Sequence, residues 1–203
     1  MKSRTRIQAT ADRRQLLEDT ALALFREKGF NGVGLRDLAK AAGVSLGNVY
    51  NHFESKDALF AVLVEKRYAE FAAATEPLAQ FLVSCKLPDD LERFGEVMRQ
   101  MVDRHRDYLT LVYVDIAEFS GVHVRPHYQQ LAKRFKAVLP ASSLPPWADA
   151  GVVFTIIYMQ FANHFVVEKL IGAKGYLGMT DKHSIEAIAK LFMYGLAPRK
   201  ETR

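Results

Sequence analysis

Apolar residues recur at helical spacing along nearly the whole chain, whereas the alternation expected of β-strands is weak. A first apolar stripe falls at positions i, i+4, i+7 and i+8 and consists of Leu17, Ala21, Leu24 and Phe25. It predicts an amphipathic helix over about residues 12–28, and Gly29 suits the left-handed conformation that ends many helices. The pattern as a whole predicts an all-α protein of about nine helices.

Two short helices are expected next, over about residues 35–42 and 45–52, and a longer one begins after Ser55 and should bend or end at Pro77. The two short helices are joined by the tight turn Ala42-Gly43-Val44-Ser45. Such a pair forms a helix-turn-helix, with the apolar side chains of its second helix facing the core.

Later helices are expected over about residues 90–104, 107–119, 126–139, 146–171 and 181–196. The links between them are short, as in helical bundles. We therefore expect a helix-turn-helix domain with an N-terminal arm over residues 1–58. A ligand-binding and dimerisation domain should follow over residues 59–203.

Composition and charge narrow the class of partner. The 203 residues are 49% apolar and 25% charged, which is ordinary for a folded globular protein. The net charge is +5, and the first fourteen residues carry five basic and one acidic side chain, so five minus one gives +4 of this surplus. Such an arm indicates a polyanionic partner, either nucleic acid or an anionic membrane surface, unless it is simply a solvated tail.

The remaining bulk features are those of a cytoplasmic protein. The single cysteine, Cys85, rules out an internal disulfide and fits a reducing compartment. No apolar signal-peptide core follows the basic terminus. The most apolar stretch, residues 152–171, includes Gln160, Glu168 and Lys169, so it predicts a buried helix and not a membrane span.

The segment after the turn offers hydrogen-bonding groups on its outward face but no acid–base pair. A helix of this kind fits the DNA major groove, where an asparagine can bond adenine and an apolar side chain can contact a thymine methyl group. Gly47 would let the backbone approach closely, while Tyr50 and Lys56 suit phosphates. Spacing alone leaves open a purely structural helix pair.

Residues 25–60, FREKGFNGVGLRDLAKAAGVSLGNVYNHFESKDALF, resemble the DNA-binding domain of TetR-family transcriptional regulators. The resemblance implies a homodimer that binds a palindromic operator, usually as a repressor released by a small effector. By matched position it implies DNA contacts at Arg36, Ser45, Leu46, Gly47, Asn48, Tyr50, Asn51, His52 and Lys56.

Several positions depart from the usual pattern of that family. Val33 and Gly34 stand where threonine or serine is usual, Asn48 replaces a common threonine, and Leu46 replaces a common lysine. These changes should weaken contacts to the DNA backbone. We therefore expect the N-terminal arm to compensate through two basic side chains that reach the minor groove, Arg4 and Arg6.

The helix over about 146–171 is apolar on two sides, so most of its girth must be covered. We expect one stripe to form a four-helix dimer interface with the last helix. The expected interface residues are Val153, Ile157, Phe161, Phe165, Ile185, Ile188 and Phe192. A second stripe contains Phe154, Tyr158, Ala162 and Val166, and both stripes could instead be internal core.

Aromatic rings and polar tips in the middle helices suggest a pocket for a small, largely apolar or aromatic effector. The candidates are His105, Tyr108, Tyr113, Phe119, His127, Trp147, Tyr158 and His164, each of which could equally be a core residue. His123 and His127 lie four apart, but Pro126 and the lack of a third ligand argue against a metal site. Cys85 lacks the local charges that mark a redox switch.

These observations predict a ligand-responsive DNA-binding regulator that needs no cofactor and is not an enzyme. No nucleophile–base pair, phosphate-binding loop or metal-ligand cluster is recognisable in the sequence. The alternative is an adaptor that uses its helix-turn-helix for protein contacts only. The operator, the effector, the regulated genes and the sign of the regulation are not encoded in any recognisable pattern.

Overall fold

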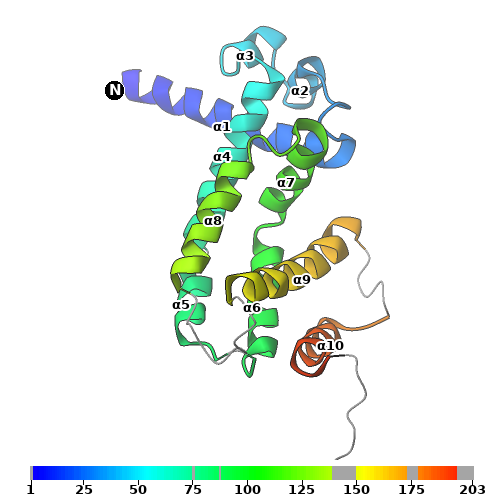
Figure 1. Ribbon diagram of the computed structural model, residues 1–203. Coiled ribbons are helices and arrows are strands. Elements are labelled where there is room, and N and C mark those ends of the chain that lie inside the picture. Colours follow the sequence, from blue (N-terminus) through cyan, green and yellow to red (C-terminus); the bar gives the residue numbers. More distant parts are fainter. Residues whose placement is uncertain (1, 75, 87, 139–149, 173–177, 196–203) are drawn as a thin grey trace, which may run out of the picture. The chain divides into compact units, whose positions relative to one another are not determined.

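The structure is a computed structural model that describes residues 2–74, 76–86, 88–138, 150–172 and 178–195 (Figure 1). Within these ranges the chain forms ten α-helices and no strand, which confirms the all-α prediction. The helices are α1 (Lys2–Lys28), α2 (Leu35–Ala41), α3 (Leu46–Tyr50), α4 (Lys56–Ala74), α5 (Glu76–Ser84), α6 (Leu91–Arg104), α7 (Arg106–Phe119), α8 (Arg125–Val138), α9 (Ala150–Ile171) and α10 (Asp181–Tyr194).

Two boundaries differ from the prediction. Helix α1 begins at Lys2 and not near residue 12, so the basic arm continues the first helix (Figure 1). Residues 2–11 have no apolar stripe, and their helical state could not be read from periodicity. The long helix expected after Ser55 is divided into α4 and α5, and Pro77 falls in the first turn of α5, where a proline is well tolerated.

The chain divides into two compact units, which we describe separately. The first unit comprises Met1–Glu70 and Thr110–His127, and the second comprises Phe71–Leu109 and Tyr128–Arg203. The split falls within α4, α7 and α8, so each of these helices contributes residues to both units. The boundary between residues 58 and 59 that we expected from the sequence remains a proposal about domains.

Aromatic side chains form the centre of the first unit. The Phe30 and Phe119 ring centroids lie 4.6 Å apart, and Phe60 lies 5.0 Å from Phe119 and 5.9 Å from Phe25. Buried rings at these distances stabilise a core through dispersion and removal of apolar area from water. The cluster joins the end of α1, the start of α4 and the end of α7, and it therefore fixes the base on which α2 and α3 rest.

A buried carboxylate closes the turn between α7 and α8. Asp115 is fully buried and accepts hydrogen bonds from the backbone N–H groups of His123 and Val124 at 3.1 and 3.0 Å. Its other oxygen lies 2.6 Å from His123 Nδ1. A buried carboxylate is tolerated because its lone pairs are used in this way.

In the second unit, α6 crosses α9 and α10 at close range. The Phe94 ring lies 5.6 Å from Phe154 and 5.7 Å from Phe161, and all three side chains are buried. A Cβ added at Gly95 would come within 2.6 Å of Phe161 Cε1 and 2.9 Å of Ile185 Cγ2. The glycine therefore sets how closely the three helices can approach.

Candidate nucleic-acid interface

Short-range contacts hold the helix-turn-helix in place. The Gly34 N–H donates to Asp37 Oδ2 at 2.9 Å, which satisfies one free donor at the start of α2. Gly43 has φ +67°, a left-handed conformation that favours glycine, and it reverses the chain after α2. Ser45 then caps α3 by accepting from the Asn48 backbone N–H at 3.2 Å.

Helix α3 is only five residues long, so packing and not intrinsic propensity holds it. Val49 is fully buried and Phe53 is 3% exposed, and they attach the helix to the core of the unit. The opposite face is open to solvent: the Tyr50 side chain is 55% exposed, and Gly47 and Asn51 are also exposed. The structure therefore gathers the predicted residues Ser45, Leu46, Gly47, Asn48, Tyr50, Asn51 and His52 on one short segment, with Arg36 exposed on the neighbouring α2.

Asn48 is held differently from a freely exposed recognition residue. Its Oδ1 atom is buried and has no hydrogen-bond partner among the described residues. A bidentate contact to adenine needs both the oxygen and the nitrogen of the amide. The side chain must therefore rotate before it can make that contact, and rotation would also release a buried acceptor that is costly to leave unsatisfied.

Gly47 has no steric role within the protein. The nearest atom to a Cβ added there would be Ser45 Oγ at 4.0 Å, which is no closer than ordinary contact. The fold itself would therefore accept a larger residue at this position. A glycine on the exposed face of a recognition helix is consistent with close approach by a partner.

Lys56 does not extend from the surface as expected for a phosphate contact. Its Nζ donates to the Phe30 carbonyl at 2.8 Å and lies 4.0 Å from the centroid of the Phe30 ring. The ammonium group thus ties the start of α4 to the residues just after α1, and its role in binding phosphate stays a prediction. The side chains of Arg4 and Arg6 lie outside the described ones, and only the helical backbone of these residues is known.

A cavity of about 340 Å³ lies between the first half of α1 and the end of α3. It is lined by Ala9, Thr10, Arg13, Asn48, Asn51 and His52. The α3 residues were among the predicted DNA contacts, whereas Thr10 and Arg13 were not. Arg13 was already within the predicted helix over 12–28, but only the continuation of α1 through residues 2–11 places Ala9 and Thr10 one turn before it on the same helix.

The predicted effector residues are divided between the two units. Tyr113, Phe119 and His127 belong to the first unit, and His105, Tyr108, Tyr158 and His164 belong to the second. Trp147 lies outside the described residues. The shared effector pocket stays a prediction.

Phe119 and His127 are parts of the first unit's packing. Phe119 belongs to the aromatic cluster, and His127 is 3% exposed and stacks on Tyr68 with ring centroids 3.6 Å apart. The Nε2 atom of His127 also lies 3.0 Å from Glu65 Oε1. His127 is thus covered by the chain itself and Phe119 is half-buried, and ligand binding by these two residues stays a prediction.

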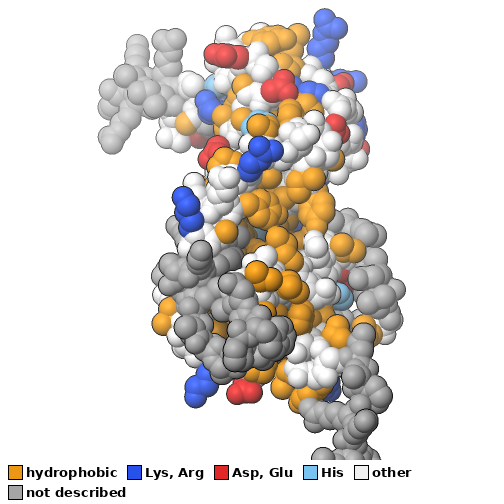
Figure 2. Space-filling view, viewed as in Figure 1, with side chains coloured by type: hydrophobic (Ala, Val, Ile, Leu, Met, Phe, Trp, Pro, Cys, Tyr) orange, Lys and Arg blue, Asp and Glu red, His pale blue; other side chains and the backbone are white. Residues whose placement is uncertain are grey.

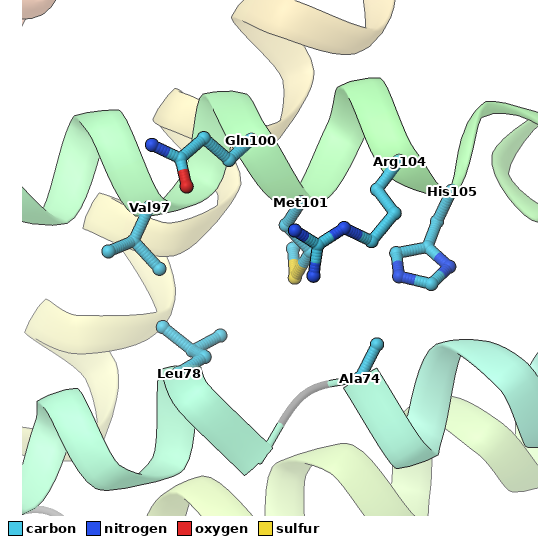
Figure 3. A pocket seen from close by; sticks show the side chains of 7 residues that line it. All are labelled: Ala74, Leu78, Val97, Gln100, Met101, Arg104 and His105. Carbon is cyan, nitrogen blue, oxygen red and sulfur yellow. The ribbon is translucent and has the colours of Figure 1, made fainter.

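A second, smaller cavity of about 90 Å³ lies in the second unit, between α6 on one side and the end of α4 and the first turn of α5 on the other (Figure 3). Its lining residues are Ala74, Leu78, Val97, Gln100, Met101, Arg104 and His105. Figure 3 shows the Arg104 guanidinium and the His105 ring extending from α6 toward this gap. Of the predicted effector residues, His105 alone lines it; Tyr108 is buried against Phe71, with ring centroids 4.9 Å apart.

Most of the expected dimer stripe on α9 is buried within the single chain. Phe161 and Phe165 are fully buried and Ile157 is 4% exposed, so these side chains pack within the chain. The exposed apolar side chains are instead Val152, Ile156 and Met159 on α9 and Leu191 and Tyr194 on α10. On α10, Ile185 and Ile188 are buried and Phe192 is half-buried. Figure 2 shows apolar side chains, in orange, reaching the molecular surface on the face in view.

Helix α9 is long and apolar enough over Gly151–Lys169 to cross a membrane by length and composition alone. Its packing against Phe94 and the burial of Glu168 are those of a core helix in a folded protein. Burial also raises the pKa of the Tyr158 hydroxyl on the same helix. Among the described residues no group of three or more histidine, cysteine or acidic side chains could hold a metal ion.

Cys85 is buried, and burial raises the pKa of its thiol. A thiol is reactive as its thiolate, so a raised pKa disfavours oxidation chemistry at this position. The side chain thus fits the role of a small apolar core residue.

Comparison with known proteins shows which family the helix-turn-helix segment resembles. Residues 17–63 match the model of the bacterial regulatory proteins of the tetR family. The chain is 40% identical over 65 residues to the HTH-type transcriptional regulator AcrR of Shigella flexneri, which covers 32% of this chain and 30% of that protein. It is 43% identical over 60 residues to the probable acrEF/envCD operon repressor of Escherichia coli K12, covering 30% and 27%. The matched regions thus span less than a third of either relative.

Solved structures extend the likeness to the whole fold. A TetR-like transcriptional regulator from Rhodococcus sp. RHA1 superposes with a TM-score of 0.65, covering 92% of this chain and 97% of that one at 20% identity. The fatty acid degradation regulator FadR from Bacillus halodurans gives a TM-score of 0.61 over 92% and 97% at 14% identity. Residues 17–63 are thus similar to the DNA-binding segment of the tetR family of bacterial regulatory proteins, and the chain as a whole shares its fold with solved structures of such regulators.

Proposed function

We propose that the protein is a transcriptional regulator that inserts α3 into the DNA major groove. The observation that carries this proposal is the exposed face of α3, which offers Asn51, Tyr50 and an unobstructed glycine while Val49 and Phe53 hold the helix from behind. A short helix anchored on one side and rich in hydrogen-bonding groups on the other suits base-edge recognition.

The experiment selects DNA from fragments of the source genome with the purified protein and then measures binding to the enriched sites as salt is varied. A regulator should enrich a common sequence, and its affinity should fall steeply with salt because bound phosphates release counterions. A helix-turn-helix adaptor would give neither result. Failure to enrich any sequence, with no retention on DNA at low salt, would refute the proposal.

We further propose that two chains bind a palindromic operator together. Val152, Ile156 and Met159 are exposed on α9, and Leu191 and Tyr194 are exposed on α10. A partner chain would remove this apolar surface from water. The two α3 segments would then occupy successive major grooves if about 34–36 Å separated them.

The test of the dimer is an Ile156→Glu variant examined by sedimentation. Ile156 is 54% exposed, so the charge should be tolerated by the single chain but not inside an apolar interface. The wild type should sediment as a dimer and the variant as a folded monomer. The proposed interface would be refuted if the wild type were a monomer at micromolar concentration, or if the variant still formed a dimer.

We also propose that the protein represses transcription and that binding of a small effector releases it from DNA. The E. coli relative is named an operon repressor, which supports the same sign of regulation here. The cavity beside α6 has an apolar wall of Leu78, Val97 and Met101 and a polar end formed by Gln100 and Arg104. This lining suits an effector with a small apolar body and a polar or anionic head. Such an effector would act in the cytoplasm, where the DNA lies.

The test compares short aromatic and aliphatic carboxylates with the corresponding amides in a thermal-shift assay. A carboxylate that binds in the cavity should raise the melting temperature, and Arg104→Ala should abolish the rise. The same compound should release DNA from the wild type only. If the compound raised the melting temperature equally for the wild type and Arg104→Ala, it would bind outside this cavity.

A further inference from the structure

The cavity between α1 and α3 is lined almost entirely by groups that can donate hydrogen bonds. Thr10 and Arg13 come from α1, and Asn48, Asn51 and His52 come from α3 and the residues after it. Ala9 completes the lining, which contains no carboxylate. Hydroxyl, guanidinium, amide and imidazole groups around one opening favour an occupant that accepts hydrogen bonds and carries negative charge.

Adjacent arginines on α1 are used in different ways. Arg14 pairs with Glu18 at 3.1 Å and lies 4.9 Å from the centroid of the Phe53 ring, so it supports the packing of the unit. Arg13 is exposed, lines the cavity, and has no ion pair among the described residues. The nearby carboxylate of Asp12 accepts from Gln8 Nε2 at 2.9 Å. Arg13 is thus a cation whose partner is not supplied by its immediate neighbours on α1.

Asn48 adds a constraint on what can occupy the cavity. Asn48 lines the cavity, but its Oδ1 atom is buried, so this acceptor does not face an occupant. The cavity also shares Asn51 and His52 with the exposed segment that faces DNA in the proposed function. An occupant of this cavity would therefore lie directly beside the bases that α3 reads.

We propose that this cavity seats a phosphate of the DNA backbone next to the bases read by α3, with Arg13 as its main ionic contact. The inference rests on the proposed function and deepens it by naming a backbone contact on α1. A guanidinium can contact two phosphate oxygens at once, and the hydroxyl and amide donors around it can hold the remaining one. The volume of about 340 Å³ also leaves room for the attached sugar. Such a contact fixes the register of α3 without reading sequence.

The proposed contact between Arg13 and a phosphate compensates for weaker contacts to the DNA backbone elsewhere in the first unit. Lys56 is engaged by the Phe30 carbonyl, and Gly34 supplies no hydroxyl at the start of α2. Two expected backbone contacts are therefore weakened, and a cation on α1 can take over part of their role. The continuous helix from Lys2 makes this possible because it holds Arg13 in a fixed position beside α3.

The experiment measures operator affinity against salt concentration for the wild type, Arg13→Ala, Arg13→Lys and a control, Lys133→Ala. Lys133 is exposed on α8, so its loss removes the same unit of charge away from the cavity. Arg13→Ala should lower the slope of log affinity against log salt by about 0.9 on every operator variant. Between 50 and 200 mM salt the wild type should then lose about threefold to fourfold more affinity than Arg13→Ala. The Lys133→Ala slope should match the wild type.

Ethylation of single phosphates locates the contact. One phosphate flanking each half-site should weaken wild-type binding when ethylated and have no effect on Arg13→Ala, while Arg13→Lys should retain the slope but bind more weakly. An Arg13→Ala slope equal to the wild type, with the same ethylation pattern, would overturn the inference and leave the proposed function intact. A wild type that binds no DNA would instead refute the proposed function. Stabilisation by inorganic phosphate that Arg13→Ala removes, with an unchanged DNA slope, would show a free-anion site and also overturn the inference.

Discussion

Gly47 in α3 and Gly95 in α6 both lie inside helices, but a Cβ added at each would meet different surroundings. At Gly95 it would collide with Phe161 and Ile185, whereas at Gly47 it would meet nothing closer than Ser45 Oγ at 4.0 Å. The second unit is thus constrained by its own packing. Packing within the chain does not require the glycine at position 47, and in the proposed function it lies where DNA approaches the backbone.

The Gly95→Ala variant should give the largest effect. The new methyl group would overlap Phe161 Cε1 at 2.6 Å, and neither α9 nor α10 can move without disturbing other buried contacts. Overpacking of this kind usually lowers the free energy of unfolding by about 1–3 kcal/mol. Urea unfolding followed by circular dichroism measures the loss. An unchanged midpoint would mean that the α6 crossing is loose, and the contrast between the two glycines would disappear.

Asn48→Ala should separate stability from recognition. Removing the buried Oδ1 atom, which has no partner among the described residues, should leave the melting temperature unchanged or raise it. On DNA the same variant should alter preference at one base pair, by about 1–3 kcal/mol. Binding to operators substituted at each position measures the change. Tyr50→Phe is the matched control, because loss of a phosphate contact should weaken every operator about equally.

Gly47→Ala tests whether the glycine in α3, unlike Gly95, matters for DNA binding and not for packing within the chain. Alanine is more favourable than glycine in a helix by about 0.5–1 kcal/mol, so the free protein should become slightly more stable. Operator affinity should fall, because the added methyl group would lie between α3 and the DNA. Urea unfolding and operator titration of the same preparation give both values. If affinity and stability both rise, the backbone at residue 47 does not approach DNA closely.

The sequence predicted the helices where an apolar stripe is clear. The expected helix over 90–104 is found as Leu91–Arg104, and that over 126–139 as Arg125–Val138. The recognition segment was also predictable, because Gly43 and Ser45 are local signals for a turn and a cap. The first turns of α1 were missed because Lys2 to Ala11 carry no apolar stripe, although the chain there is helical.

The position of each side chain around α9 could not be predicted from the sequence. The helix is apolar on more than one side, so periodicity shows that it must be covered but not which stripe faces α6. The structure buries Phe161 and exposes Ile156, a side chain that belongs to neither of the two expected stripes. Likewise, the pairing of Lys56 with the Phe30 carbonyl depends on the fold that brings α1 and α4 together.

The smallest effect expected concerns acid pH in the second unit. Hydrogen bonds from Arg99, and then from Gln100, hold the pKa of Glu96 at about 2, below its ordinary value of 4.5. A carboxylate with a depressed pKa in the folded state contributes stability above pH 4.5, and the contribution is lost as pH falls toward 2. The same Arg99 lies 3.8 Å from Asp181 at the start of α10, so the pair also supports the contact of α6 with α10.

Because Glu96 is 44% exposed, solvent screening should keep this contribution small. Urea unfolding at several pH values between 4.5 and 3 should show a decline for the wild type that is shallower in Glu96→Gln. Glu92→Gln, an exposed change on the same helix that leaves the Glu96–Arg99 pair intact, should decline as the wild type does. Operator affinity at neutral pH should be the same for all three proteins, since this pair belongs to the unit that packing constrains. A loss of affinity in Glu96→Gln would instead link the α6 pair to the DNA-binding face and weaken the division between the two units.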